Sequence, residues 1–228
     1  MRYHHLEKAV FRERKNRFVA EVEKDGRPLL VHVPNTGRCR ELFVSGAEVY
    51  IERSANSARK YPSSLVIVKK GDRLVHIDSA GANRLVEEGL KAGTIPGLED
   101  VARVEREKTF GRSRFDFRFQ KGDRICYMEV KGVTLEEDGV AKFPDAPTER
   151  GARHLRELVA AKKEGYGAYI LFVIQMKGVK TFTPHRERDP LFFKELRAAY
   201  EQGVTVMACD TVVTPEWIRL DREIPMKL

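Results

Sequence analysis

The chain reads Arg114-Phe115-Asp116-Phe117-Arg118-Phe119 near its centre, turns at Lys121-Gly122-Asp123-Arg124 and continues as Ile125-Cys126-Tyr127-Met128-Glu129-Val130-Lys131. A two-residue loop with glycine in its first position favours a tight β-hairpin. Such a hairpin pairs Lys121 with Arg124, and counting back along both strands places Asp116 opposite Glu129. The stretch therefore predicts two antiparallel strands in a defined register.

The two faces of this hairpin differ in chemistry. Phe115, Phe117 and Phe119 alternate along the first strand, so we expect them to share one buried face with Cys126, Met128 and Val130. The other face carries the carboxylates of Asp116 and Glu129, whose Cβ atoms should lie about 5 Å apart. Like charges at that distance destabilise a sheet unless a positive group lies between them. We therefore expect a divalent cation at this position.

An aspartate followed by Glu-x-Lys on the next strand suits metal-dependent cleavage of phosphodiesters. Asp116 and Glu129 would hold Mg²⁺ or Mn²⁺ through hard oxygen ligands, and the metal would activate a water molecule. Lys131 follows Glu129 by two residues and shares its face, so it could orient that water or stabilise charge on the phosphate. The alternative is structural, with Lys131 only neutralising the two carboxylates as an ion pair.

Two predicted helices flank the hairpin and offer further site residues. Glu88 lies on the first of them, residues 82–90, where it is either an additional metal ligand or an exposed helix glutamate. The second helix spans about 148–164, with a buried stripe formed by Ala152, Leu155, Leu158 and Val159. The stripe leaves Arg150, Arg153, His154 and Glu157 on the opposite side. Arg150 and His154 could grip a phosphate there, with a solvated basic surface as the competing interpretation.

The net charge of +8 is concentrated in the first third of the chain. Residues 1–80 hold 16 Lys and Arg against 10 Asp and Glu, which is +6. A basic module of this kind is typical of a protein that binds a polyanion, because each neutralised phosphate releases counterions. A lysine-rich soluble surface would have the same composition, so charge alone leaves both interpretations open.

Nothing in the composition of the 228 residues indicates a membrane or an oxidising compartment. The longest strongly apolar run, residues 168–174, is far too short to span a bilayer, and the first residues lack the apolar core of a signal peptide. The three cysteines, Cys39, Cys126 and Cys209, match neither a disulfide framework nor a zinc-ligand spacing. We expect a cytoplasmic protein with buried thiols.

Turn chemistry divides the chain near residue 80. Five short strands are predicted at 9–12, 18–23, 29–33, 48–52 and 64–68, and they suit a five-stranded oligonucleotide-binding (OB) barrel over residues 1–80. The basic loop 53–61 suits contact with a nucleic-acid backbone and bases, through Arg53, Arg59, Lys60 and Tyr61. A solvated loop, with Tyr61 packed on the barrel, is the alternative. Residues 81–228 combine helices with a buried strand at 168–174, which predicts a mixed sheet flanked by helices, and a loop is expected at 134–147.

Several short motifs together resemble one family. They are Pro34-Asn35-Thr36-Gly37, Ala82-Asn83-Arg84-Leu85, Ser113-Arg114-Phe115-Asp116-Phe117, Cys126-Tyr127-Met128-Glu129-Val130-Lys131 and Phe143-Pro144-Asp145-Ala146-Pro147-Thr148-Glu149-Arg150-Gly151. The chain is similar in these motifs to the sugar fermentation stimulation protein A family of bacteria and archaea. The resemblance implies an OB-like barrel joined to a domain of the PD-(D/E)xK, restriction-endonuclease-like fold, with largely sequence-nonspecific DNA binding. It also implies catalytic positions at Asp116, Glu129 and Lys131, with Glu88 as the helix carboxylate.

Two functions remain open at this point. The first is a DNA-binding protein with a metal-dependent nuclease site, and the second is a non-catalytic DNA-binding regulator of sugar metabolism, maltose use included. RNA is a further candidate ligand, because barrels of this kind bind it too. The sequence leaves the oligomeric state open, a homodimer included. Fold alone does not choose between these functions.

Overall fold

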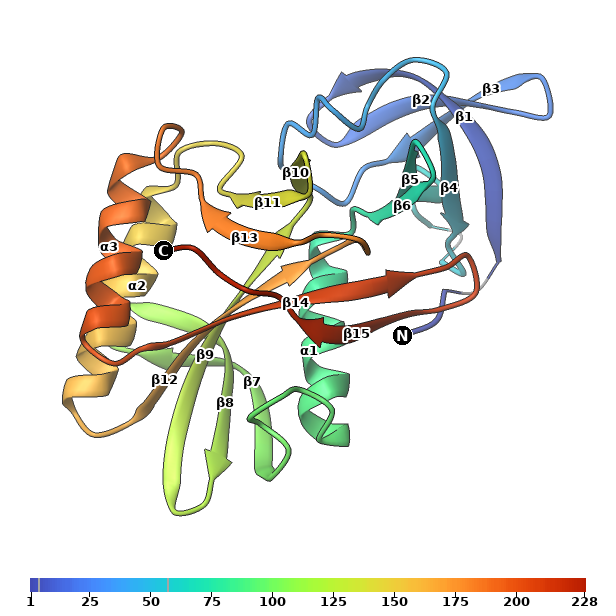
Figure 1. The fold of residues 1–228 in the computed structure, drawn as a ribbon. Coiled ribbons are helices and arrows are strands. Elements are labelled where there is room, and N and C mark those ends of the chain that lie inside the picture. The colour runs from blue at the N-terminus through green and yellow to red at the C-terminus, as the bar shows by residue number, and fades with distance from the viewer. Residues whose placement is uncertain (4, 57) are drawn as a thin grey trace.

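A computed structural model describes residues 1–3, 5–56 and 58–228. The chain forms a barrel and a larger mixed-sheet unit that lie against each other (Figure 1). The strands of the barrel are β1 (Leu6–Asn16), β2 (Val19–Lys24), β3 (Arg27–His32), β4 (Glu48–Arg53), β5 (Ser63–Lys70) and β6 (Arg73–His76). All five predicted strands are confirmed. A sixth strand, β6, pairs antiparallel with β5 and leads toward the larger unit.

The barrel closes through a pairing between strands that are not neighbours in the sequence. Its sheet runs β3-β2-β1-β4-β5-β6, and His32 on β3 also pairs with Ser64 on β5. Apolar side chains from alternate positions fill the interior, and Phe11, Ile51 and Leu65 are fully buried there. The result is the closed, five-stranded OB-like barrel that the sequence predicts.

The larger unit contains three helices and nine strands within the described residues. They are α1 (Ser79–Ala92), β7 (Val101–Phe110), β8 (Ser113–Lys121), β9 (Arg124–Val133), β10 (Leu135–Glu137), β11 (Val140–Phe143), α2 (Glu149–Lys163), β12 (Gly167–Ile174), β13 (Thr181–Pro184), α3 (Pro190–Glu201), β14 (Thr205–Val213) and β15 (Ile218–Glu223). The main sheet has the order β15-β14-β12-β9-β8-β7. Strand β12 runs parallel to β9 and β14, and the other pairs are antiparallel.

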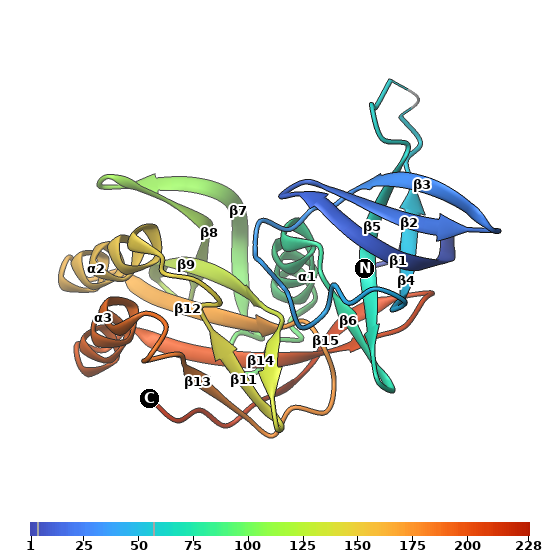
Figure 2. The same ribbon diagram turned by 90° about the horizontal axis from the view of Figure 1, so that it is seen from above.

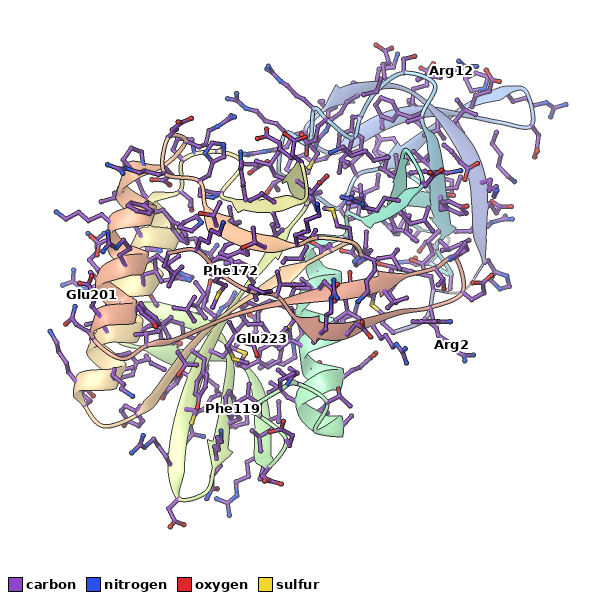
Figure 3. The ribbon with its side chains drawn as sticks, viewed as in Figure 1. Arg2, Arg12, Phe119, Phe172, Glu201 and Glu223 are labelled. Carbon is purple, nitrogen blue, oxygen red and sulfur yellow. The ribbon has the colours of Figure 1, made fainter. Side chains whose placement is uncertain are left out.

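Helices cover both faces of this sheet (Figure 2). Side chains of β12 alternate between the two faces, as a fully buried strand requires. Leu171 and Val173 pack with α1, whereas Ile170, Phe172 and Ile174 pack with α2 and α3. Phe119 and Phe172 lie within the layers, while Arg12 and Glu201 point outward (Figure 3). The predicted mixed sheet flanked by helices is confirmed.

Several strands differ from the expectation. The segment 134–147, expected as a loop, contains β10 and β11, which pair with each other and with β13 in a separate three-stranded sheet. Strands β7 and β15 lie at the two edges of the main sheet and carry many charged residues. Edge strands bury little apolar surface, so their sequences lack the alternation that marks an internal strand.

The central hairpin is formed by β8 and β9. Its predicted register is confirmed from the pair Lys121 and Arg124 to the pair Phe117 and Met128. Beyond that pair the regular backbone pairing of β8 with β9 ends, and the Asp116 carboxylate accepts the Val130 N–H at 2.8 Å.

The expectation that Phe115 shares a face with Phe117 and Phe119 is wrong. Its ring lies 5.7 Å from that of Tyr127 and 6.1 Å from that of His154, on the side covered by α2. Phe117 and Phe119 pack instead on the side of α1. The change of face coincides with the point where the regular pairing of the two strands ends and a side-chain oxygen takes the Val130 N–H.

A buried polar network joins the barrel to the larger unit. His76 at the end of β6 is fully buried, and its Nε2 lies 2.7 Å from the Tyr3 hydroxyl. Gln175 Nε2 contacts His76 Nδ1 at 3.0 Å and donates to the Asp78 carbonyl at 3.1 Å. Arg84 on α1 donates to Asp78 Oδ2 at 2.5 Å. Groups from both units therefore satisfy one another at the junction.

The three cysteines are free and buried, as predicted. Across residues 1–3, 5–56 and 58–228, none of the helices combines the length and the apolar character needed to cross a membrane.

Candidate functional site

Asp116 lies in a cleft of about 460 Å³ that both units line. Its Oδ1 accepts a hydrogen bond from Asn83 Nδ2 at 2.7 Å, and its Oδ2 accepts the Val130 N–H at 2.8 Å. Asn83 belongs to α1 and Val130 to β9, so two elements orient the carboxylate. Burial, followed by the nearby charge of Glu129, raises the pKa of Asp116.

Glu129 lines the same cleft and is only 3% exposed. Its Oε1 lies 2.6 Å from Lys131 Nζ and 2.5 Å from His154 Nδ1. Burial alone would raise its pKa, but the imidazole and the ammonium group outweigh burial, and the pKa of Glu129 is lowered. Its other oxygen, Oε2, is buried and has no hydrogen-bond partner among the described residues.

His154 lies elsewhere on its helix than the sequence predicts. We expected it on the side opposite the apolar stripe of α2, but it is 2% exposed and faces Glu129. Its Nε2 lies 3.4 Å from Arg150 Nε, which assigns the ring proton to Nδ1. The contact between Nδ1 and Glu129 is close but lies outside hydrogen-bond geometry, so Nδ1 has no hydrogen-bond partner in the described part of the chain.

The helical periodicity is consistent with a buried position for His154, although its polar side chain suggests an exposed one. It follows Gly151 by three residues and precedes Leu158 by four, and both of these are buried. It therefore lies on the stripe itself. Arg150 lines the cleft near the start of α2, while Arg153 is exposed and does not line it.

Glu88 is not brought to the cleft. Its Oε2 accepts a hydrogen bond from the Met1 ammonium group at 2.6 Å, and it lines a different hollow beside Arg219 and Asp221. Asn83, more than one turn earlier on α1, is the helix residue that contacts Asp116. The sequence did not indicate Asn83, because the residue expected from this helix was a carboxylate and not an amide.

The basic loop 53–61 lies away from the cleft lining. Arg59 contacts His32 Nδ1 at 3.3 Å and donates to Ser64 Oγ at 3.1 Å, so it is held against the barrel. Lys60 Nζ lies 5.4 Å from the centre of the Tyr61 ring, and Arg53 is exposed. Ser57 within this loop lies outside the described residues. A DNA-binding role for this loop stays a prediction.

The barrel contributes one wall of the cleft through Asn35, Thr36 and Gly37. Arg14 on β1 holds this segment, because its guanidinium donates to four backbone carbonyls at 2.6 to 3.0 Å, those of Arg17, Asn35, Gly37 and Arg38. From the other unit, Asp145 Oδ2 accepts the Arg38 N–H at 3.1 Å. The cleft is therefore a composite of both units.

The donor groups of the cleft fit a hard divalent cation. Such ions prefer carboxylate oxygens and retain several water ligands. The unpartnered Glu129 Oε2 is a free ligand atom, and burial together with the nearby charge of Glu129 raises the pKa of Asp116, so a positive ion would favour the charged form of both groups. Among the residues that the structure describes, no group of three or more His, Cys, Asp and Glu side chains is arranged to hold a metal. Further ligands would have to come from water, backbone or substrate oxygens.

Fold and cleft together define a two-part protein, an OB-like barrel followed by a mixed-sheet domain with paired carboxylates at the junction. Residues 13–77 match the family described as SfsA N-terminal OB domain, and residues 80–217 match the Sugar fermentation stimulation protein RE domain. The chain belongs to the sugar fermentation stimulation protein A (SfsA) family.

Relatives are similar to this chain over most or all of its length. A sugar fermentation stimulation protein homolog of Thermoanaerobacter sp. is 54% identical over 203 residues, which is 88% of each chain. One from Caldanaerobacter subterraneus is 49% identical over 221 residues, covering 97% of this chain and 96% of that one. The structure of Pyrococcus furiosus SfsA in complex with Ca²⁺ superposes with a TM-score of 0.93 at 28% identity, covering 100% of this chain and 98% of that one.

Proposed function

We propose that the cleft binds Mg²⁺ or Mn²⁺ through Asp116 and Glu129 and hydrolyses phosphodiester bonds of DNA. The observation that carries this proposal is the buried Glu129 Oε2, which has no hydrogen-bond partner within the described residues and belongs to a residue that lines the same cleft as Asp116. A buried carboxylate oxygen without a partner costs free energy unless a ligand occupies its lone pairs. The Ca²⁺ in the Pyrococcus furiosus relative supports a divalent cation as that ligand.

The residues around the two carboxylates have separable roles in this proposal. Lys131 Nζ, 2.6 Å from Glu129 Oε1, holds a positive charge where a phosphate would enter, and it stabilises the charge that builds up in the transition state. His154 Nδ1 lies against the same oxygen of Glu129 and restricts the position of that side chain. Arg150 at the mouth of the cleft binds a phosphate oxygen. The cation, when bound, polarises the phosphate and lowers the pKa of its water.

One observation favours the second function, a DNA-binding regulator of sugar metabolism that does not cut. Lys131 and His154 both lie within ion-pair distance of Glu129 Oε1, and no third acidic ligand stands beside the pair in the described residues. An ammonium group and an imidazole beside a single carboxylate can satisfy it without a metal. A site of this kind would hold DNA at its phosphates without activating water.

Cleavage assays with matched variants separate the two functions. The wild type should cut supercoiled or single-stranded DNA in Mg²⁺ or Mn²⁺ and stop in EDTA, and Asp116→Asn, Glu129→Gln and Lys131→Met should each lose about 100-fold or more in rate. Glu88→Gln, at the carboxylate that the structure places outside the cleft, should cut like the wild type. Cleavage that persists in Asp116→Asn would exclude this site as its source.

Calorimetric titration of Mn²⁺ supplies a readout that is independent of cleavage. Binding should be detectable in the wild type and in Glu88→Gln and should disappear in Asp116→Asn and Glu129→Gln. Wild type that binds DNA but neither binds Mn²⁺ nor cuts would instead support the regulator.

A further inference from the structure

A second groove, of about 610 Å³, lies on the barrel next to the cleft. The two hollows share Thr36 and Gly37 in their linings, so the groove and the cleft are neighbours on the surface. Its walls come from the β1–β2 turn and from the segment after β3. None of the basic residues that the sequence suggested for DNA binding lines it.

Positive charge dominates this groove. Its lining contains Arg14, Arg17, Arg38 and Arg40 and no carboxylate among the described residues. Arg14 is committed to the four backbone carbonyls that shape the wall, and its guanidinium lies 4.8 Å from the centre of the Phe43 ring. Arg17, Arg38 and Arg40 are exposed and form no salt bridge within the described part of the chain. Arg17 Nε donates to the Thr36 carbonyl at 3.4 Å, which leaves its charge without a carboxylate partner. Three guanidinium groups whose charge no carboxylate neutralises match a chain of phosphates.

An exposed aromatic residue follows one of these arginines in the chain. Phe18 follows Arg17 at the turn between β1 and β2 and is 50% exposed, which is unusual for a phenylalanine. Phe43 cannot serve as a platform in the same way, because Arg14 covers its ring and Phe11 stacks on it at 5.3 Å. An exposed aromatic side chain one residue from the lining of a basic groove is a candidate platform on which unpaired bases stack.

We propose that this groove, formed by Arg17, Arg38 and Arg40 with Phe18 at its edge, binds a single-stranded phosphodiester chain and leads it into the carboxylate cleft. The proposal rests on the function proposed above and adds the class of substrate, a single strand or a single-stranded flank. Bases in a duplex are stacked on one another, so only an unpaired base can reach Phe18.

Binding measured in EDTA tests the groove without cleavage. Labelled oligo-dT and oligo-rU of about 20 nucleotides, longer than the site of one OB fold, are titrated by fluorescence anisotropy beside a duplex of the same length. Single strands should bind more tightly than the duplex. The double variant Arg17→Glu/Arg38→Glu should lose about 10-fold or more in affinity, and its salt dependence should fall by about 1.4 in slope, since each phosphate contact contributes about 0.7 for single strands.

The control is a double charge reversal on the same barrel, Arg27→Glu with Lys69→Glu. Arg27 lies at the β2–β3 turn, at the other end of strand β2, and neither residue lines the groove. The control should weaken binding by about 3-fold or less, because it alters only the long-range field. Equal loss in both double variants, or tighter binding of the duplex than of the single strand, would overturn the proposal. Thermal unfolding of each variant confirms that exposed substitutions leave the fold intact.

Phe18→Ala isolates the stacking contact. Its affinity for oligo-dT should fall by about 5-fold or more, while its affinity for an abasic strand of the same length should match that of the wild type. An equal loss on both strands would remove Phe18 from the proposal. Comparison of oligo-dT with oligo-rU identifies the natural sugar. Groove variants that lose binding although the wild type does not cut would leave the groove standing and reject only the nuclease.

Discussion

At the scale of single residues, the site is built around a carboxylate pair whose members have opposite pKa shifts. Burial and the charge of Glu129 raise the pKa of Asp116, whereas the imidazole of His154 and the ammonium group of Lys131 lower the pKa of Glu129. The hydrogen bonds from Val130 and Asn83 and the charge of Lys131 favour the ionised Asp116 but do not fully offset its burial, so the folded protein disfavours the charged form. This cost makes a testable prediction about stability.

Asp116→Asn should raise the free energy of unfolding at pH 7 by about 1 kcal/mol. The amide oxygen can still accept the Val130 N–H, and the Asn83 amide can turn over to accept from the new NH₂ group. Because the folded pKa of Asp116 is raised, the folded state binds the proton more tightly than the unfolded state, and stability falls as pH rises from about 3.9 through the folded pKa. The gain in the variant should vanish below that window.

Urea unfolding at several pH values measures this effect, with Glu88→Gln as the control at an exposed carboxylate. A variant that is less stable than the wild type at pH 7 would show that the hydrogen bonds of the charged carboxylate outweigh its burial. Added Mn²⁺ should reverse the order, since only the wild type keeps both ligands.

Much of the site can be predicted from the alternation of side chains between the two faces of a β-strand. The hairpin register placed Asp116, Glu129 and Lys131 near one another, and the structure places all three in the cleft lining. His154 and Asn83 were missed, because one is a polar residue on an apolar stripe and the other makes its contact across the fold. Pairing with Glu129 is what permits His154 to be buried, and such a partner cannot be read from the helix alone.

At the scale of elements, Asp189 couples the two helices on one face of the sheet. Its Oδ1 accepts the Phe192 N–H at 2.9 Å and caps α3, and its Oδ2 accepts the Thr148 N–H at 2.7 Å at the start of α2. Thr148 in turn caps α2 by accepting the Gly151 N–H at 3.0 Å. One buried carboxylate thus helps to fix the helix that carries His154 and Arg150.

Asp189→Ala should lower the free energy of unfolding by about 2 kcal/mol, at the upper end for a helix cap, because it also leaves a buried N–H without a partner. Asp189→Asn keeps one oxygen acceptor and should lose less. Glu201→Ala, at the exposed end of α3, is the control and should change stability by about 0.5 kcal/mol or less. Urea denaturation measures all three, and equal stability of the alanine variant and wild type would contradict the coupling.

The strands of the barrel and the buried strand β12 were predictable because turns and apolar runs mark them. Strands β7, β10, β11, β13 and β15 were not, because they are short or charged and owe their conformation to the partners with which they pair. An Asp before Pro190 is a cap signal that the sequence does carry. Its second bond, to Thr148, depends on the tertiary fold.

At the scale of the whole molecule, the junction contains a histidine that must stay neutral. Burial lowers the pKa of His76 to about 4. In the bonded arrangement, Nε2–H donates to Tyr3 and Nδ1 accepts from Gln175, so a second proton at Nδ1 would oppose an amide donor. Arg84, close to the same network, adds positive charge and further disfavours protonation.

Acid should therefore separate the units or unfold the chain earlier than the carboxylates alone predict. The folded pKa of His76 lies below the unfolded value of 6.5, so its contribution is present above pH 6.5 and is lost as pH falls to about 4. The full loss is about 3 kcal/mol. Urea unfolding between about pH 7 and pH 4.5 should show this slope in the wild type, and His76→Gln should be less stable at pH 7 and lack it. Identical slopes in both proteins would assign the titration to other groups.

The wall that Arg14 builds has a consequence for how such proteins can be recombined. Its side chain organises the segment 35–38 from within the barrel, and Asp145 receives that segment from the other unit. A chimera that exchanges barrels between relatives must then take Arg14 and segment 35–38 from the same protein. That segment must also fit the Asp145 of the other protein's larger unit. Where segment 35–38 of one relative does not match the residue at position 145 of the other, the hybrid should fold in both halves but lack a formed cleft between them.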